Sequence, residues 1–120
     1  MQFFDMIARY TPGPTAAWLW LLAAGIAEIG WAVGLKFSDG FTRPLPTAWT
    51  VMCLVASFPM LAIALKSIPI STGYAVWTSI GIAGAVAVGV LFLQEPASLA
   101  KFACLGMILT GVVGLKLIGT

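Results

Sequence analysis

Long apolar runs alternate with short polar interruptions along this chain of 120 residues. Four of the runs have about the 20 residues that a helix needs to cross a bilayer core roughly 30 Å thick. They predict helices over residues 16–35, 47–65, 71–93 and 97–118. Since a spanning helix satisfies its own backbone hydrogen bonds, the pattern predicts an all-α integral membrane protein whose four transmembrane helices pack as a bundle.

The first 15 residues do not continue this pattern. They contain Asp5, Arg9 and the turn sequence Thr-Pro-Gly-Pro at residues 11–14, so they lack the uninterrupted apolar core of a signal peptide. We expect residues 1–15 to form an uncleaved tail with a short interfacial helix through Met6. Residues 16–120 would then form the membrane domain.

The composition supports a membrane protein, because 61% of the residues are hydrophobic and 8% are charged, and a soluble domain of this size could not bury so much apolar surface. The chain has no histidine, and its two cysteines, Cys53 and Cys104, lie in apolar runs without CxxC spacing. We therefore expect no disulfide, metal site or other cofactor. A net charge of +2 without a basic run also argues against a nucleic-acid partner.

One carboxylate lies in the middle of the first apolar run. Glu28 is part of the sequence Ala-Gly-Ile-Ala-Glu-Ile-Gly-Trp-Ala at residues 24–32, in which Trp31 shares its helical face. At a rise of roughly 1.5 Å per residue, Glu28 lies about 12 Å inside Lys36, near the bilayer midplane. A charge there costs about 2.5–3.5 kcal/mol, which indicates a site for protons or cations. The alternative is a glutamate that another helix holds for structural reasons.

Basic residues are shared equally between the two ends of the predicted helices. One side carries Arg9, Lys66 and Lys116, and the other carries Lys36, Arg43 and Lys101. An equal count gives the positive-inside rule no preferred orientation, so the chain is expected to insert both ways round. Two oppositely inserted copies would supply the inverted halves between which transporters commonly build a midplane site.

Small residues form a stripe along the last predicted helix. Its members follow at spacings of three, four and four: Ala103, Gly106, Thr110 and Gly114. Such a stripe lets two helices approach closely, and we expect it to form the seam of a homodimer. The alternative is that the stripe packs within one protomer.

Several segments together resemble the small multidrug resistance family, and specifically its guanidinium-exporter subtype. The resemblance covers residues 18–117 and is carried by residues 27–32, 35–43, 56–58 and 73–81. It implies an antiparallel, dual-topology homodimer in the inner (plasma) membrane that exchanges protons for a small cation at Glu28. Trp31 resembles the guanidinium exporters more than the quaternary-ammonium branch, which tends to have a smaller residue there.

The resemblance also implies a binding set for substrate and proton. Its members are Glu28, Trp31, Ser57, Tyr74 and Trp77, with Gly25 giving access beside the carboxylate. The family has a glycine-containing break in its third helix, but Ser79 stands where a glycine is usual. The hinge is therefore assigned to Gly81 and Gly84.

These residue types suit a guanidinium ion. Such an ion can direct two N–H donors onto one carboxylate, here Glu28. The hydroxyls of Ser57 and Tyr74 are expected to hold that carboxylate in one rotamer, and Trp31 and Trp77 to offer cation–π faces. The alternatives are core packing or an interfacial belt for the aromatic residues, and a bond back to its own helix for Ser57.

A buried carboxylate also couples the two ions. Removal from water disfavours its charged form, so a proton and a cation are competing ways to neutralise it. An exporter of quaternary ammonium or lipophilic cations on the same scaffold is the nearest alternative. A rotary ATPase rotor subunit would be a two-helix hairpin with a dense glycine repeat, and a non-transporting assembly factor would leave Glu28 without a ligand. No nucleophile–base pair that would indicate an enzyme can be assembled.

Overall fold

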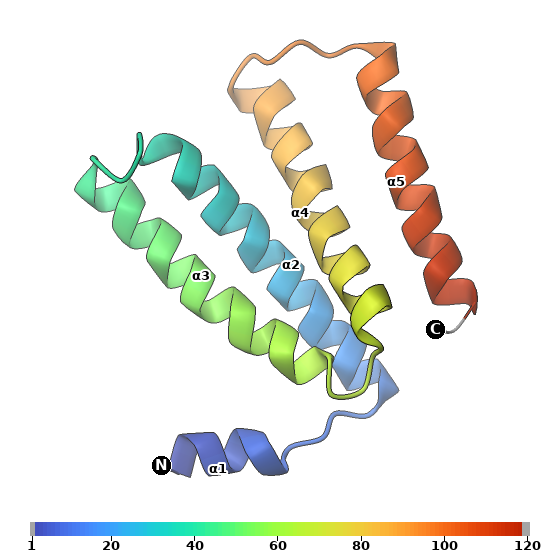
Figure 1. The fold of residues 1–120 in the computed structure, drawn as a ribbon. Helices are drawn as coiled ribbons and strands as arrows, with labels where there is room; N and C mark the ends of the chain where they lie inside the picture. Colours follow the sequence, from blue (N-terminus) through green and yellow to red (C-terminus); the bar gives the residue numbers. More distant parts are fainter. Residues whose placement is uncertain (1, 119–120) are drawn as a thin grey trace.

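The protein is described here by a computed structural model of residues 2–118, which form five helices (Figure 1). They are α1 (Gln2–Arg9), α2 (Pro14–Phe37), α3 (Pro44–Ala64), α4 (Ile70–Phe92) and α5 (Leu99–Ile118). The last four are long and apolar enough to cross a membrane. An all-α chain with four such helices is therefore confirmed, whereas the homodimer and its dual topology stay predictions.

Prolines begin two of the long helices, which start earlier than the sequence pattern predicts. Pro14 follows the N-cap residue Gly13 of α2, and Pro44 follows the N-cap residue Arg43 of α3. Proline is tolerated in the first turn because that turn has no intrahelical partner for its N–H. The predicted starts at residues 16 and 47 wrongly treated these prolines as lying outside the helices.

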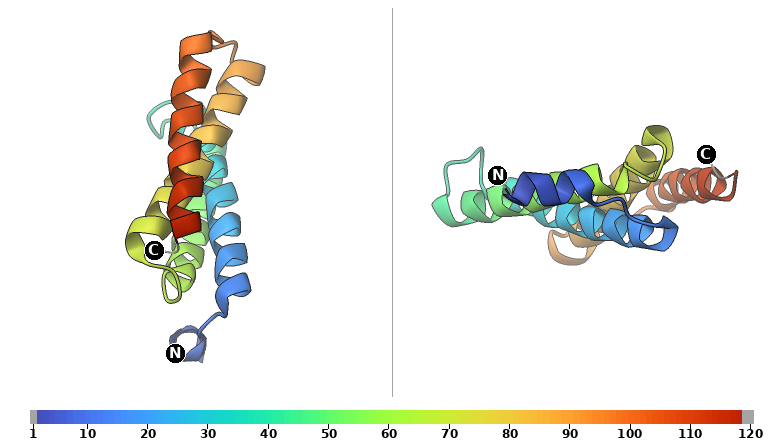
Figure 2. Two further views of the ribbon diagram at one scale, coloured as in Figure 1. Left: turned by 90° about the vertical axis from the view of Figure 1, so that its right-hand side faces the viewer. Right: turned by 90° about the horizontal axis from the view of Figure 1, so that it is seen from below.

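The four long helices lie side by side in one layer, in the order α3, α2, α4, α5 (Figure 1). The layer is thin, since the described part of the chain measures 45 × 40 × 17 Å, and Figure 2 shows it from the edge. Helix α2 packs against both α3 and α4. The buried apolar core forms along these contacts and includes Leu21, Leu61 and Trp77. The middle of α2 is therefore enclosed from both sides.

Helix α5 lies at the edge of the layer, beside α4, and buries none of its residues. A closed four-helix bundle, expected from the sequence, is therefore not what one copy of the chain forms. Lipid chains are as apolar as leucine, so no hydrophobic effect drives an apolar helix against its neighbours in a membrane. An exposed apolar helix remains available to lipid or to another protein.

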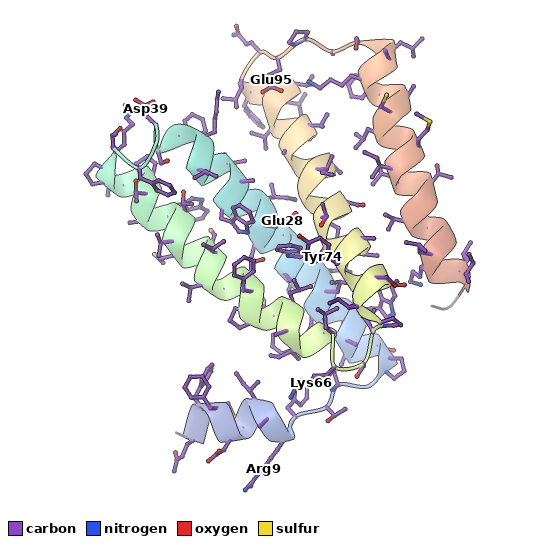
Figure 3. All side chains as sticks on the ribbon, viewed as in Figure 1. Arg9, Glu28, Asp39, Lys66, Tyr74 and Glu95 are labelled. Carbon is purple, nitrogen blue, oxygen red and sulfur yellow. The ribbon has the colours of Figure 1, made fainter. Side chains whose placement is uncertain are left out.

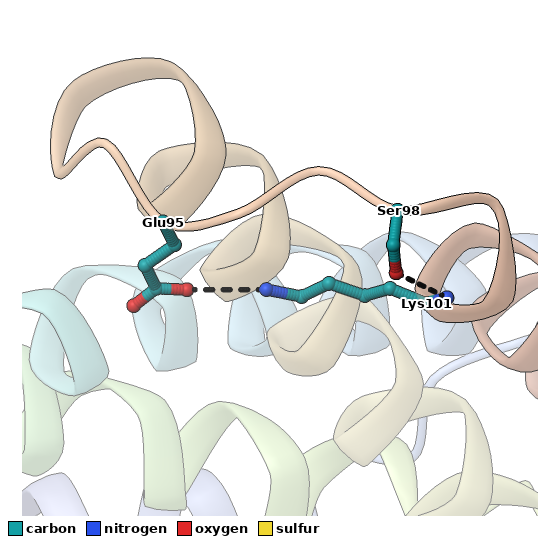
Figure 4. Close-up of polar contacts among 3 residues, drawn as sticks. All are labelled: Glu95, Ser98 and Lys101. Carbon is teal, nitrogen blue, oxygen red and sulfur yellow. Dashed lines mark hydrogen bonds and ion pairs between the residues drawn. The ribbon is translucent and has the colours of Figure 1, made fainter.

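Polar contacts order the connection between α4 and α5 (Figure 4). The Ser98 hydroxyl accepts a hydrogen bond from the Lys101 backbone N–H at 3.1 Å, as an N-cap does. The Lys101 Nζ lies 3.4 Å from Glu95 Oε1. At the other end of α5, the Lys116 Nζ lies 5.1 Å from the centre of the Trp18 ring. Charged side chains thus attach both ends of α5 to the rest of the chain.

Candidate functional site

Glu28 lies in the middle of α2, and its side chain is 8% exposed. Its carboxylate lies against Gly81 of α4, between the two helices (Figure 3). A Cβ atom at Gly81 would overlap the Glu28 side chain from Cγ to Oε1. The glycine therefore provides the space in which the carboxylate lies.

The surroundings of this carboxylate offer it no polar partner. Within residues 2–118, no side chain or backbone group forms a hydrogen bond or ion pair with the Glu28 carboxylate; the buried hydrogen bonds of Ser57 join other groups. A buried charge without compensation is costly, and a proton or a bound cation would remove that cost. The arrangement is suited to holding one small positive ion at a time.

Ser57 joins three helices through hydrogen bonds that do not include the Glu28 carboxylate. Its fully buried hydroxyl donates to the Ala24 carbonyl oxygen of α2 at 2.8 Å and accepts from Nε1 of Trp77 in α4 at 3.1 Å. The expected hydrogen bond from Ser57 to the carboxylate is therefore absent from the described chain. The alternative of a bond within its own helix is also wrong. The small Ala24 side chain lets α3 approach α2 so closely that a backbone carbonyl becomes the acceptor.

Aromatic rings cluster beside this hydrogen-bonded chain. The Trp77 ring centre lies 5.4 Å from that of Tyr74 and 5.8 Å from that of Phe58. Trp77 is buried, whereas Tyr74 is 55% exposed and opens onto the surface of the layer. Phe58 was not among the predicted site residues, although it directly follows Ser57 in a segment that carries the family resemblance. Its ring lies beside that of Trp77 and belongs to the same aromatic cluster.

Trp31 follows Glu28 by one helical turn and is partly buried against the core. Its Nε1 is buried and has no hydrogen-bond partner among residues 2–118. A buried indole N–H normally finds an acceptor. The structure thus places Glu28, Ser57 and Trp77 where α2, α3 and α4 meet, and the Trp31 N–H has no acceptor in the part of the chain that the structure describes.

The remaining predicted glycines lie where helices approach closely. A Cβ atom at Gly25 would overlap the side chain of Ile80, and one at Gly84 would overlap that of Ile29. In this protomer Ile80 therefore fills the space beside Gly25 that was expected to give access. Helix α4 continues without interruption through Gly81 and Gly84, so their visible role is to let α4 approach α2.

The predicted stripe on α5 faces away from α4. Ala103, Gly106 and Thr110 are exposed, and a Cβ atom at Gly106 or Gly114 would meet no atom within 4 Å. The side of α5 near α4 instead carries Ile108 and Val112 among other residues. The alternative that the stripe packs within one protomer is therefore wrong.

Comparison with known proteins identifies the family. Residues 16–108 match the family described as Small Multidrug Resistance protein. The chain belongs to the small multidrug resistance family. Helices α3 and α4 lie wholly within the matched residues, and α2 does so from residue 16 onward, whereas α1 precedes them. The contact around Glu28 is thus formed by the small multidrug resistance segment of the chain.

Several proteins similar to this chain are guanidinium exporters. The one from Yersinia pseudotuberculosis serotype I (strain IP32953) is 50% identical over 101 residues, which cover 84% of this chain and 97% of the relative. Those from Citrobacter freundii and Salmonella typhimurium are each 46% identical over 101 residues, covering 84% of this chain and 96% of the relative. These similarities confirm the family resemblance of the sequence and, with four apolar helices, indicate a multi-pass membrane protein.

Proposed function

We propose that this protein exports guanidinium and small guanidinyl cations in exchange for protons, and that both ions bind to Glu28. The observation that carries the proposal is the Glu28 carboxylate, which is buried in the middle of a spanning helix against Gly81. The high identity to guanidinium exporters supports the choice of cation. Tyr74 and Trp77 of α4 contribute the aromatic surface beside the site.

A guanidinium ion suits this site because it is planar and always charged, and its N–H donors can bind both oxygens of one carboxylate. Trp77 donates its N–H to Ser57, and its ring, which lies beside those of Tyr74 and Phe58, is proposed to offer a face for cation–π contact. The partly buried Trp31 ring offers a second such face on the helix that carries Glu28. Gly81 and Gly84 are proposed to let α4 shift against α2 when Glu28 exchanges a bound proton for a cation.

Proton coupling follows from the single carboxylate. Because Glu28 is neutralised by either a proton or a cation, binding of one displaces the other. The empty, charged site would cross between the inward and outward states too rarely to leak protons. Exchange therefore needs no second titratable residue.

The functional unit is proposed to be an antiparallel homodimer in the inner membrane, with residues 16–120 as the transporter domain and residues 1–15 as a tail. The equal distribution of basic residues supports insertion in both orientations. On the outer face of α5, Gly106 and Thr110 are exposed and a Cβ atom at Gly114 would meet no atom within 4 Å, which supports close contact between the α5 helices of two copies. Each copy would supply one Glu28 to a shared midplane site.

Electrical recording tests this function. The purified protein is reconstituted on a solid-supported membrane, and currents are recorded on guanidinium concentration jumps. We expect a current from the native protein and none from Glu28→Gln, which retains the shape of the side chain but not its charge. Asp39→Asn is the matched control, because Asp39 is exposed in the turn between α2 and α3 and its loss should leave the current intact.

Three results would contradict the proposal. A proton-coupled guanidinium current in Glu28→Gln would exclude Glu28 as the shared site. A native protein that responds to a quaternary ammonium ion and not to guanidinium would be the broader multidrug exporter instead. Silence to both ions in a sample that elutes as a folded protein would favour a non-transporting role. Glu28→Asp, which keeps the carboxylate, should retain a reduced current and thus separates loss of charge from misfolding.

A further inference from the structure

Helix α1 is amphipathic although it lies outside the family segment. At 100° per residue, Phe3, Met6 and Ile7 share one face, whereas Asp5 and Arg9 lie on the other. Phe3 and Met6 are more than half exposed. Eight residues are too few for a stable isolated helix in water, so α1 needs contacts that hold it.

The loop between α3 and α4 provides such contacts. The Lys66 ammonium group donates hydrogen bonds to the carbonyl oxygens of Ile7 and Tyr10, the latter at 2.7 Å (Figure 3). These carbonyls belong to the C-terminal end of α1, where a positive charge is favourable. The adjacent Ser67 hydroxyl donates to the Pro12 carbonyl oxygen at 2.6 Å.

The start of α2 provides another contact. The Trp20 Nε1 donates to the Tyr10 hydroxyl at 3.1 Å, and the two rings meet edge to face at 6.3 Å between their centres. The tail is therefore attached to two elements of the membrane domain. These contacts position α1 below the C-terminal part of α3 (Figure 1).

An apolar groove of about 410 Å³ lies between α1 and α3. Its lining includes Phe3, Met6 and Ile7 from α1 and Pro59, Met60 and Ile63 from α3. The groove continues the exposed apolar face of α3, on which Met52, Val55 and Pro59 follow at helical spacing. In a multi-pass membrane protein this face contacts lipid, so acyl chains that cover α3 also reach the groove.

We propose that α1 lies in the membrane surface, with lipid acyl chains filling the groove beneath it and Lys66 capping its C-terminal end. The helix is an interfacial anchor in which the apolar face contacts lipid and the polar face contacts water. The opposite charges of Asp5 and Arg9 cancel, so insertion depends on apolar contact and does not need anionic lipid. This anchoring goes beyond the proposed transport and does not depend on it.

Spin-label accessibility in proteoliposomes tests the anchor. Nitroxide labels are placed at Phe3→Cys and, separately, at Asp5→Cys, in a full chain whose own cysteines carry Cys53→Ala and Cys104→Ala. The vesicles are zwitterionic phosphatidylcholine. We expect the label at position 3 to be relaxed more by oxygen, which partitions into lipid, than by a water-soluble nickel complex. The order should reverse at position 5.

A second comparison tests the cap. Lys66→Met removes the donors to α1, and we expect the label at position 3 to gain mobility and lose its preference for oxygen. Lys36→Met is the matched control, because Lys36 is also a lysine at a helix end but makes no contact with α1 among the described residues; the label should not change.

Three other results with the spin labels would overturn the proposal. Stronger relaxation by the nickel complex at position 3 would mean that the groove opens to water. Protection of position 3 from both reagents would mean that protein, such as a second copy of the chain, covers the groove. An unchanged label in Lys66→Met would show that Lys66 does not hold the helix. None of these results depends on whether guanidinium is transported.

Discussion

The contact between α2 and α4 and the outer face of α5 both contain glycines, but they use them differently. At the first, Gly81 and Gly84 leave space that Glu28 and Ile29 fill. At the second, a Cβ atom added to Gly106 or Gly114 would meet no atom within 4 Å. Glycine thus permits close packing of α4 against α2 within one protomer. On the outer face of α5, glycine instead leaves a surface that no side chain of the described protomer covers. A pattern of glycines in the sequence indicates that another helix can approach closely. Only the tertiary structure shows which helix or side chain lies there.

The same contrast applies to the polar groups of the two regions. Around α2, a buried chain of hydrogen bonds runs from Trp77 through Ser57 to Ala24. Helix α5 is attached by an exposed ion pair from Lys101 and a cation–π contact from Lys116. Buried hydrogen bonds are costly to break, whereas exposed ion pairs contribute little. Substitutions in the two regions should therefore differ in how much they lower the stability of the protein.

The largest loss of stability and transport is expected from adding a side chain at the contact between α2 and α4. Gly81→Ala places a Cβ where the Glu28 carboxylate lies, so either the carboxylate or α4 must move. Overpacking of this kind costs about 1–3 kcal/mol, and the guanidinium current should be lost with it. Thermal unfolding in detergent and the current on a supported membrane would measure the two effects.

Gly111→Ala is the control for that substitution, because an added Cβ there meets no atom within 4 Å. It should retain both the current and the unfolding temperature. If Gly111→Ala lowered the current and the unfolding temperature as much as Gly81→Ala does, the glycines of α4 and α5 would not differ in how tightly they are packed.

A different defect is expected from enlarging the outer face of α5. Gly106→Leu should leave the unfolding of the protomer unchanged but weaken the dimer, since its side chain would separate the two α5 helices. Single-molecule photobleaching in liposomes would report the fraction of dimers. Ile108→Phe enlarges a side chain about 160° away from both Gly106 and Thr110, on the side of α5 near α4, and should leave that fraction unchanged. A dimer that survives Gly106→Leu would place the seam elsewhere.

A moderate loss of stability is expected from removing the hydroxyl that joins three helices. Ser57→Ala deletes a donor to Ala24 and an acceptor for Trp77, which leaves the buried indole N–H unpaired at a cost of about 1–3 kcal/mol. Denaturant unfolding would measure the loss.

Ser79→Ala serves as the comparison for Ser57→Ala, because the Ser79 hydroxyl donates only within its own helix, to the Ala75 carbonyl at 2.7 Å. It should cost less than Ser57→Ala. If the two alanine variants were equally stable, the hydrogen bonds between helices would contribute nothing beyond those within a helix.

The smallest effect is expected at the connection to α5. Glu95→Gln and Lys101→Gln break an ion pair whose side chains are 44% and 32% exposed. Exposed pairs contribute about 0.2–1 kcal/mol, so a double-mutant cycle on unfolding should give a coupling energy in that range. A coupling well above it would show that the pair, and not the packing of α4, positions α5.

The local features of the sequence predicted the helices well. Each of the four apolar runs corresponds to one helix, because the length and composition of a spanning segment are visible in the run itself. The errors lie at the ends, where Pro14 and Pro44 begin helices that were expected to begin later. The closed bundle expected for one copy of the chain was also wrong, since no sequence pattern states how tightly an apolar helix packs in lipid.

The site was predicted less completely. Glu28 was recognisable from its depth in an apolar run, and the segments resembling the family identified Ser57 and Trp77. The sequence did not reveal that the Ser57 hydroxyl would bond to a backbone carbonyl 33 residues away. Phe58 was also missed, because an aromatic residue in an apolar run carries no signal of its own.

The sequence by itself determined that four helices are long enough to span a membrane and that one carboxylate lies in the middle of the first of these helices. Both follow from the length of apolar runs and from the position of a charge within them. Only the tertiary structure decided that Gly81 lies against Glu28 and that Lys66 caps α1. These contacts join residues more than 50 positions apart, and they depend on the rotation and spacing of whole helices, which no local pattern specifies.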